Sequence, residues 1–187
     1  MNGLVIAGGK STRMQQDKAM LQYHGMPQYQ YVYNMLQSFC SETFISLHTE
    51  NNNIPLPKII DNPNYSNAGP MAALLTAFEQ YKSDWLVVAI DYPLISNSHI
   101  EGLMSCFANT KKSCVYYNTD TNFYEPFIGV YTSAFLSTFV KEFAGQQTSL
   151  QKILQQNNVQ KITVANSQVL QSIDTPEQYQ AIQKLLA

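Results

Sequence analysis

The sequence has little charge of either sign. Only 13% of its 187 residues are charged, with 11 lysines and arginines against 13 aspartates and glutamates, and the net charge is −2 at pH 7. A protein that binds mainly nucleic acid needs an excess of positive charge, because it must neutralise phosphates. We therefore expect no nucleic-acid partner, and each local group of cations has to be interpreted separately.

Long apolar runs are also absent. No stretch reaches the ~18 consecutive apolar residues that a membrane span needs, and the apolar run before Lys10 is too short for the hydrophobic region of a signal peptide. Cysteine is scarce, since Cys40, Cys106 and Cys114 are scattered and lack the paired spacing of a metal site. We therefore expect a cytoplasmic protein with reduced thiols that does not contact a membrane.

The sequence does have enough apolar residues, 45% of the chain, for one sizeable core. Apolar runs typical of buried strands alternate with segments of helical spacing, without a repeat, a low-complexity linker or a domain boundary. This alternation predicts a three-layer α/β/α, Rossmann-like fold with a mainly parallel sheet, and residues 1–187 as a single domain. Strands are expected at 4–7, 43–47, 57–61, 84–91, 114–117 and 161–164, and helices at 29–39, 70–81, 98–107, 134–143, 149–155 and 176–186.

The most informative stretch runs from Leu4 to Lys18. Its apolar start ends at Gly8 and Gly9, and glycines let a backbone approach a ligand closely and point successive N–H groups at an anion. The polar and cationic residues that follow are Lys10, Ser11, Thr12, Arg13 and Lys18. We interpret this stretch as a loop that holds a nucleoside triphosphate; the alternative is a polar turn after a strand.

Two other phosphate-binding loops are excluded. A Walker loop needs a glycine five residues before the glycine of Gly-Lys-Ser, and Leu4 occupies that position. A dinucleotide-binding fingerprint needs three glycines at fixed spacing, and only Gly8 and Gly9 are present.

Two carboxylates follow predicted strands. Ligands bind beyond the carboxyl ends of parallel strands, and Asp91 at such an end suits Mg²⁺, which is held by few carboxylates together with phosphates and waters. Asp61 ends strand 57–61, and one carboxylate can accept the adjacent N1–H and N2–H groups of guanine, which adenine lacks. Asn62 competes for this second role, and turn formation is the alternative for both aspartates.

His48 and Gly69 also lie where a ligand is expected. His48 follows strand 43–47, although a lone histidine is more often an ordinary surface residue. Gly69 permits a tight turn, and Pro70 suits the first position of the next helix, whose free N–H groups would face the nucleotide.

The stretch from Leu4 to Lys18 resembles the signature of nucleotidyltransferases with a nucleotide-diphospho-sugar transferase fold. Its Asp-Lys form is most similar to the molybdenum cofactor guanylyltransferases of the MobA type. The chain departs from the signature at Ile6 and at Gln15, where the family has glycine. The resemblance is strong as far as Ile95 and rests on Ala7, Gly8, Gly9, Ser11, Arg13, Met14, Asp17 and Lys18.

The resemblance implies an activity: transfer of GMP from GTP to molybdopterin, forming the guanine dinucleotide cofactor and releasing pyrophosphate, with Mg²⁺ as cofactor. Such a transfer needs positioned cations more than a covalent nucleophile. The implied catalytic residues are Arg13, Lys18 and Asp91, with Asp91 as the metal ligand. The implied nucleotide-binding residues are Ile6, Ala7, Gly8, Gly9, Ser11, Lys18, His48, Asp61, Gly69 and Asp91.

The resemblance places the acceptor molecule near Glu125 and Asp174. Glu125 belongs to segment 124–131, expected as an antiparallel edge of the sheet, and it either contacts the acceptor or merely begins the strand. Asp174 is a second metal ligand, an acceptor contact or, with Thr175, a cap of the last helix. Ser172 departs from the family, which has asparagine there.

Other activities stay open. His48 stands where the family has a base-contacting asparagine, which leaves CTP as an alternative nucleotide. A sugar-phosphate acceptor and a non-catalytic GTP-binding partner of molybdoenzymes are further alternatives, and molybdoenzymes or their chaperones are expected partners.

Overall fold

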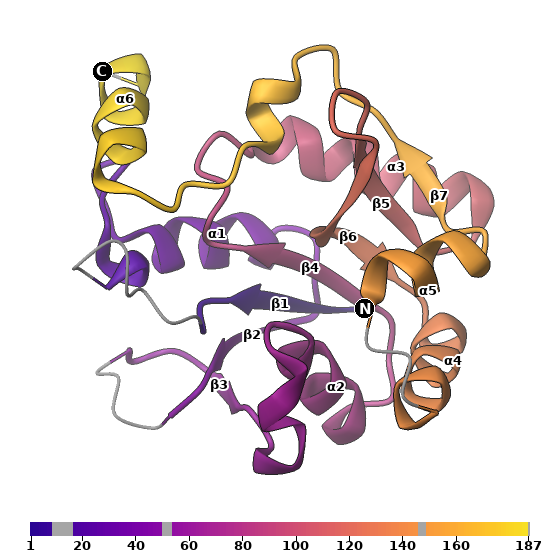
Figure 1. Ribbon diagram of the computed structural model, residues 1–187. Helices are drawn as coiled ribbons and strands as arrows, with labels where there is room; N and C mark the ends of the chain where they lie inside the picture. The colour runs from indigo at the N-terminus through magenta and orange to yellow at the C-terminus, as the bar shows by residue number, and fades with distance from the viewer. Residues whose placement is uncertain (9–16, 50–53, 146–148, 187) are drawn as a thin grey trace.

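A computed structural model describes residues 1–8, 17–49, 54–145 and 149–186 (Figure 1). Within these residues, seven strands form one sheet in the order β3-β2-β1-β4-β6-β5-β7. The strands are β1 (Asn2–Ile6), β2 (Glu42–Leu47), β3 (Lys58–Ile60), β4 (Trp85–Ala89), β5 (Cys114–Asn118), β6 (Phe123–Tyr131) and β7 (Gln160–Ile162). Six of them run in one direction and β6 runs against both of its neighbours, which confirms the mainly parallel sheet.

The expected edge position of segment 124–131 is wrong. β6 lies inside the sheet, paired with β4 on one side and β5 on the other, and the edges are β3 and β7. The physical reason is burial: Ile128, Val130 and Tyr131 are completely buried, which an edge strand facing solvent would not allow.

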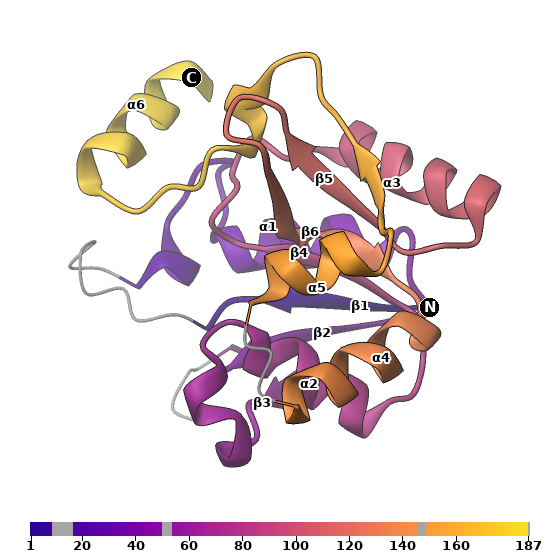
Figure 2. The same ribbon diagram turned by 45° about the vertical axis from the view of Figure 1, so that its right-hand side comes forward.

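Helices cover both faces of the sheet, which confirms the three-layer fold (Figure 2). α1 and α3 pack on one face, while α2, α4 and α5 lie on the other. The helices are α1 (Gln28–Gln37), α2 (Met71–Gln80), α3 (Asn97–Thr110), α4 (Ser133–Ala144), α5 (Leu150–Gln156) and α6 (Pro176–Leu186), with 3₁₀ turns η1 (Lys18–Met20), η2 (Pro63–Ala68) and η3 (Ser167–Leu170). None of the helices described is long and apolar enough to cross a membrane.

The core is continuous on both sides of the central strands. Every residue of β1 and β4 is buried, as expected for parallel strands that are covered on both faces. Leu4 pairs in register with Phe44 of β2 and Val87 of β4. β1 and β4 therefore end at the same level, which aligns the segments that follow them.

The last helix, α6, stands apart from the sheet and packs on the segment around η1 (Figure 1). Tyr179 makes an edge-to-face contact with Tyr23, with ring centroids 5.0 Å apart, and its hydroxyl donates to the Gln22 carbonyl at 3.3 Å. Just before α6, the Ile173 N–H donates to the Asp91 carbonyl at 2.9 Å. The C-terminal segment is thereby held against the end of β4.

Candidate nucleotide-binding site

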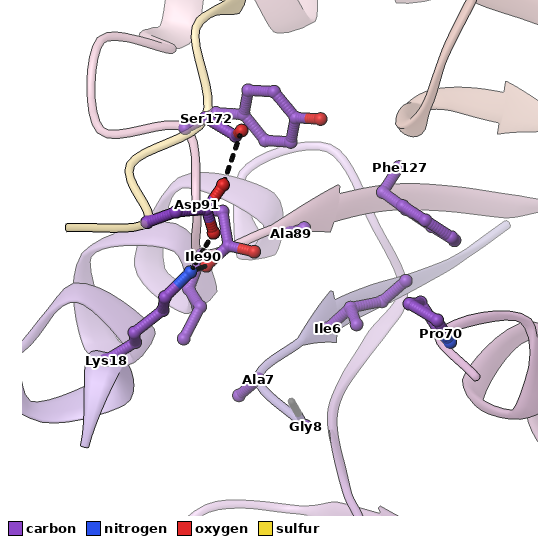
Figure 3. A pocket seen from close by; sticks show the side chains of 12 residues that line it. Ile6, Ala7, Gly8, Lys18, Pro70, Ala89, Ile90, Asp91, Phe127 and Ser172 are labelled. Carbon is purple, nitrogen blue, oxygen red and sulfur yellow. Dashed lines mark hydrogen bonds and ion pairs between the residues drawn. The ribbon is translucent and has the colours of Figure 1, made fainter. Parts of the chain in front are cut away.

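A pocket of about 290 Å³ opens at the carboxyl ends of β1 and β4 (Figure 3). From β1 the chain moves to β2 on one side, and it later returns to β4 on the other side. Such a change of direction leaves a crevice at the strand ends, where ligands bind in open α/β sheets. The pocket is lined by Ile6, Ala7, Gly8, Lys18, Pro70, Ala89, Ile90, Asp91, Tyr92, Phe127, Ser172 and Asp174.

Lys18 lies between two carboxylates in this pocket. Its ammonium donates to Asp91 Oδ1 at 3.2 Å and to Asp174 Oδ1 at 2.6 Å, and Figure 3 shows it pointing at Asp91. Asp17 fixes the approach of Lys18, because its carboxylate accepts the Ala19 N–H at 3.0 Å and caps η1. Three predicted site residues, from the beginning, middle and end of the chain, therefore meet.

The environment makes ionisation of Asp91 unfavourable. Burial raises the pKa of its carboxyl, and the negative charge of Asp174 raises it further, while Lys18 acts in the opposite direction. With both carboxylates ionised, the cluster of Lys18, Asp91 and Asp174 holds two negative charges against one positive charge. Lys18 is the cation that the described residues place against these two carboxylates.

The donor set fits magnesium better than zinc. Among the described residues, no group of three or more His, Cys, Asp or Glu side chains forms a complete metal site. Magnesium does not need one, because it keeps several waters and takes its remaining ligands from one or two carboxylates and from substrate phosphates. Asp91 and Asp174 are the carboxylates of the described pocket lining that would suit such an ion.

Asp174 is available to Lys18 because a neighbour caps α6. Thr175 Oγ1 accepts the Gln178 N–H at 3.4 Å, and Gln178 Oε1 accepts the N–H groups of Asp174 and Thr175 at 2.7 and 3.1 Å. This is a reciprocal capping box. Of the two capping candidates, Thr175 therefore has the role, and the carboxylate of Asp174 turns to Lys18 and to Ser172, whose hydroxyl donates to Oδ2 at 3.2 Å.

The predicted phosphate loop lies within the described residues at its beginning, as far as Gly8, and at its end, from Asp17. Ile6, Ala7 and Gly8 line the pocket. A Cβ added at Gly8 would come within 3.4 Å of the His48 nitrogen and 3.6 Å of its Cγ, so glycine lets this segment pass close to His48. The predicted residues Gly9, Ser11 and Arg13, together with Gln15, lie outside the described residues.

Asp61 and His48 form a pair beside this segment. The Asp61 carboxylate accepts a hydrogen bond from the Ser46 hydroxyl at 2.7 Å and lies 2.7 Å from His48 Nδ1. The Asp61 side chain is 9% exposed, whereas that of His48 is 46% exposed. Asn62 turns away, since its amide donates to Glu79 Oε2 at 2.8 Å. Of Asp61 and Asn62, the two candidates for contact with the base, Asp61 is the one that contacts His48.

Ser46 was missed by sequence reasoning. It is a completely buried polar residue within the apolar strand β2, and its hydroxyl has Asp61 as a partner. A buried hydroxyl needs a hydrogen-bond partner. The serine between the apolar residues Ile45 and Leu47 is therefore a sequence signal: its buried hydroxyl requires a polar partner from outside the strand, and here that partner is Asp61.

Glu125 does not line the pocket itself but is hydrogen-bonded to a residue that does. Tyr92, which does line the pocket, donates its hydroxyl to Glu125 Oε2 at 2.9 Å. Burial raises the pKa of the Glu125 carboxyl, against the effect of hydrogen bonds from Tyr92 and Asn118. Tyr92 and Phe127 were not predicted, and the only sequence signal for them is that they adjoin Asp91 and Pro126.

Gly69 turns the chain toward the pocket without lining it. Its φ of +56° ends η2 and is a conformation that favours glycine. Pro70 rather than Gly69 lies in the pocket wall. Pro70 is the N-cap of α2 and not its first residue, so the expected helix start was one residue early.

The family model described as the MobA-like NTP transferase domain matches residues 3–162 of this chain. The chain is 35% identical over 185 residues to a "Molybdenum cofactor biosynthesis bifunctional protein" of Synechocystis sp., covering 95% of this chain and 52% of that protein. It thus spans about half the length of this relative. It is 27% identical over 180 residues to a "Molybdenum cofactor guanylyltransferase" of Pseudomonas entomophila, covering 93% of each.

The fold is similar to that of a solved structure as well. Molybdopterin-guanine dinucleotide biosynthesis protein A from Archaeoglobus fulgidus superposes with a TM-score of 0.77 at 16% identity, over 99% of this chain and 98% of that one. This likeness confirms the predicted nucleotidyltransferase fold.

Proposed function

Because the chain belongs to the MobA-like NTP transferase family, we propose that it transfers GMP from GTP to molybdopterin. The product is a guanine dinucleotide form of the molybdenum cofactor, and pyrophosphate is released. The names of the relatives support this acceptor and this nucleotide. The observation that carries the proposal is the cluster of Lys18, Asp91 and Asp174 at the carboxyl ends of β1 and β4.

The chemistry is a displacement at the α-phosphorus of GTP. An oxygen of the acceptor's phosphate forms the new P–O bond, and the bond to pyrophosphate breaks. Negative charge builds on the phosphoryl oxygens and on the leaving group, so fixed positive charge near them lowers the barrier. Lys18 provides such charge from a side chain that is only 16% exposed.

The carboxylates around Lys18 have two roles. In the structure they hold its ammonium in the pocket, and triphosphate oxygens would compete for the same N–H groups. Asp91 and Asp174 would also hold Mg²⁺, which when bound neutralises charge on the triphosphate. Asp91 is the metal ligand in this proposal.

The base would lie at the Asp61–His48 pair. Gly8 brings the start of the phosphate loop next to His48, so a nucleotide whose phosphates follow the loop has its base within reach of this pair. CTP is the alternative substrate, since the exocyclic amino group of cytosine can also donate to His48. Guanine offers two adjacent N–H groups, so contact with the pair favours GTP.

The test is turnover of the purified protein with GTP, Mg²⁺ and molybdopterin, measured as pyrophosphate release and as the mass of the product. Lys18→Ala should lower kcat/KM roughly 100- to 1,000-fold, the usual cost of removing one group that stabilises transition-state charge. Lys141→Ala, which removes an exposed lysine of α4, is the matched control and should leave the rate unchanged.

Two results would contradict the proposal. One is equal turnover by the wild-type protein and Lys18→Ala. The other is nucleotide binding by the wild-type protein without any product, which would favour a non-catalytic GTP-binding protein.

A further inference from the structure

Two of the three cysteines are in contact at the side of the sheet where α3 packs. Cys106 lies in the last turns of α3, Cys114 is the first residue of β5, and their sulfur atoms are 2.8 Å apart. Both are free thiols in the structure. Because the S–S bond of a disulfide is about 2.0 Å long, bond formation would require the sulfurs to approach by less than one ångström.

The two thiols differ in access to solvent. Cys106 is partly exposed, whereas Cys114 is completely buried. Burial, followed by the contact with Cys106, raises the pKa of the Cys114 thiol to about 12. Cys106 is therefore the thiol that an external reagent meets first, since the thiolate is the reactive form and needs access.

The turn between the two cysteines fixes this contact. Lys111 ends α3 with φ +56°, and the Lys112 carbonyl accepts a hydrogen bond from Cys114 Sγ at 3.2 Å. The Thr110 hydroxyl donates to the Cys106 carbonyl at 2.8 Å and lies 3.6 Å from Cys114 Sγ. These bonds hold both sulfurs where they face each other.

We propose that Cys106 and Cys114 are an oxidisable dithiol that a small-molecule disulfide, such as oxidised glutathione, converts to an intramolecular disulfide. The Cys106 thiolate attacks one sulfur of the reagent, so a mixed disulfide forms and one reduced thiol leaves. Cys114 then loses its proton and attacks the Cys106 sulfur, which releases the second reduced thiol. The protein loses two protons and two electrons, which together are two hydrogen atoms, and the reagent gains them.

This modification site is independent of the proposed nucleotidyl transfer. Cys114 pairs with Val130 of β6, and Val130 pairs with Leu86, near the beginning of β4. The pocket lies beyond the other end of β4, at Ala89 and Asp91. We therefore expect the disulfide to raise the Tm, by roughly 5 °C for a loop of this length, without changing nucleotide binding.

The experiment exposes the native full chain to oxidised glutathione, followed by acid quenching and mass spectrometry without reductant. The wild-type mass should fall by two hydrogen atoms. Trypsin cuts after Lys111 and Lys112, so the digest should contain the peptide ending at Lys111 joined to the peptide beginning at Ser113. Cys40→Ser is the matched control and should behave like the wild-type protein.

Two further variants separate the steps. Cys114→Ser, which keeps a donor for the Lys112 carbonyl, should retain one glutathionyl group on Cys106 because nothing displaces it. Cys106→Ser should show neither the adduct nor the loss of hydrogens, and its circular dichroism spectrum should show that it is folded.

Three outcomes would overturn the proposal: a wild-type mass that does not change, modification at Cys40 in place of the pair, or a disulfide that appears only in denaturant. None of them depends on whether the protein transfers GMP, so the two proposals fail separately.

Discussion

Lys18 joins parts of the chain that are far apart in sequence, because its two carboxylate partners lie 73 and 156 positions away. The resemblance assigned Lys18, Asp91 and Asp174 to one site. The sequence did not predict their direct contacts, because no local pattern records which strand end receives the C-terminal segment. The main-chain hydrogen bond from Ile173 to Asp91 makes that connection.

The first prediction concerns the pH dependence of stability at Asp91. Its folded-state pKa is raised above the ordinary value of 3.8, mainly by burial, so the folded protein holds this proton more tightly than the unfolded chain does. The stability that protonated Asp91 contributes is present at low pH and is lost as the pH rises through the raised pKa. Asp91→Asn does not titrate, so the variant should gain stability relative to the wild-type protein over this pH interval.

Urea unfolding from pH 3.5 to 8 measures this difference. Glu101→Gln removes one negative charge from the exposed surface of α3 and controls for net charge. A wild-type protein that gains stability relative to Asp91→Asn as the pH rises would show that Lys18 outweighs the burial of the carboxyl.

The second prediction concerns which residue contacts the base. The two carboxylate oxygens of Asp61 face Ser46 and His48, so we expect His48 to contact the base and Asp61 to orient it. His48→Ala and Asp61→Asn should each reduce the preference for GTP over CTP roughly 10-fold, the value of one specific contact. Thermal-shift titrations with the four nucleoside triphosphates measure that preference.

Ser46→Ala is the matched variant for this second prediction. It removes a hydrogen bond to Asp61 but leaves His48 in place, so it should lower stability by about 1 kcal/mol without changing the preference. If His48→Ala kept the preference and Asp61→Asn lost it, Asp61 itself would contact the base.

At the scale of elements, local patterns predicted the strands and helices well but not every neighbour in the sheet. β1 and β4 are apolar runs, and their burial on both faces follows directly from the sequence. The interior position of β6 did not follow, because strand order depends on contacts between distant segments. One sign of it is Gly129, which lies directly between Val87 and Val115.

The third prediction tests this close approach of β5 and β6. A Cβ at Gly129 would lie 2.8 Å from Val115 Cγ2 and 2.9 Å from the Cys114 carbonyl oxygen, and a backbone atom cannot move aside easily. Gly129→Ala should therefore destabilise the protein by about 1–3 kcal/mol. Urea unfolding measures the loss, with Gly145→Ala as control because its nearest atoms would be 3.4 and 3.5 Å away. Equal stability of the two variants would contradict so close an approach of the two strands.

For the molecule as a whole, the position of the pocket follows from the order of the strands. An alternating sequence predicts a crevice at strand ends, and β1 and β4 provide it where the chain changes direction. The residues that complete the pocket come from β6 and from the segment before α6, where the sequence carries weaker signals. Phe127 and Ser172 are examples. Phenylalanine and serine occur at many positions that bind no ligand, so their presence in the sequence does not identify a site.

The last prediction is that residues 1–187 unfold as one cooperative domain. Trp85, the only tryptophan, is completely buried in β4, and it pairs with Asn2 on one side and with Tyr131 on the other. It therefore joins the parallel half of the sheet to the half that contains β6. Its fluorescence should change at the same temperature as the far-UV circular dichroism, and the calorimetric enthalpy should equal the van't Hoff value, at about 130 kcal/mol for a chain of this length. A fluorescence change that precedes the loss of secondary structure would instead show that the two halves of the sheet unfold separately.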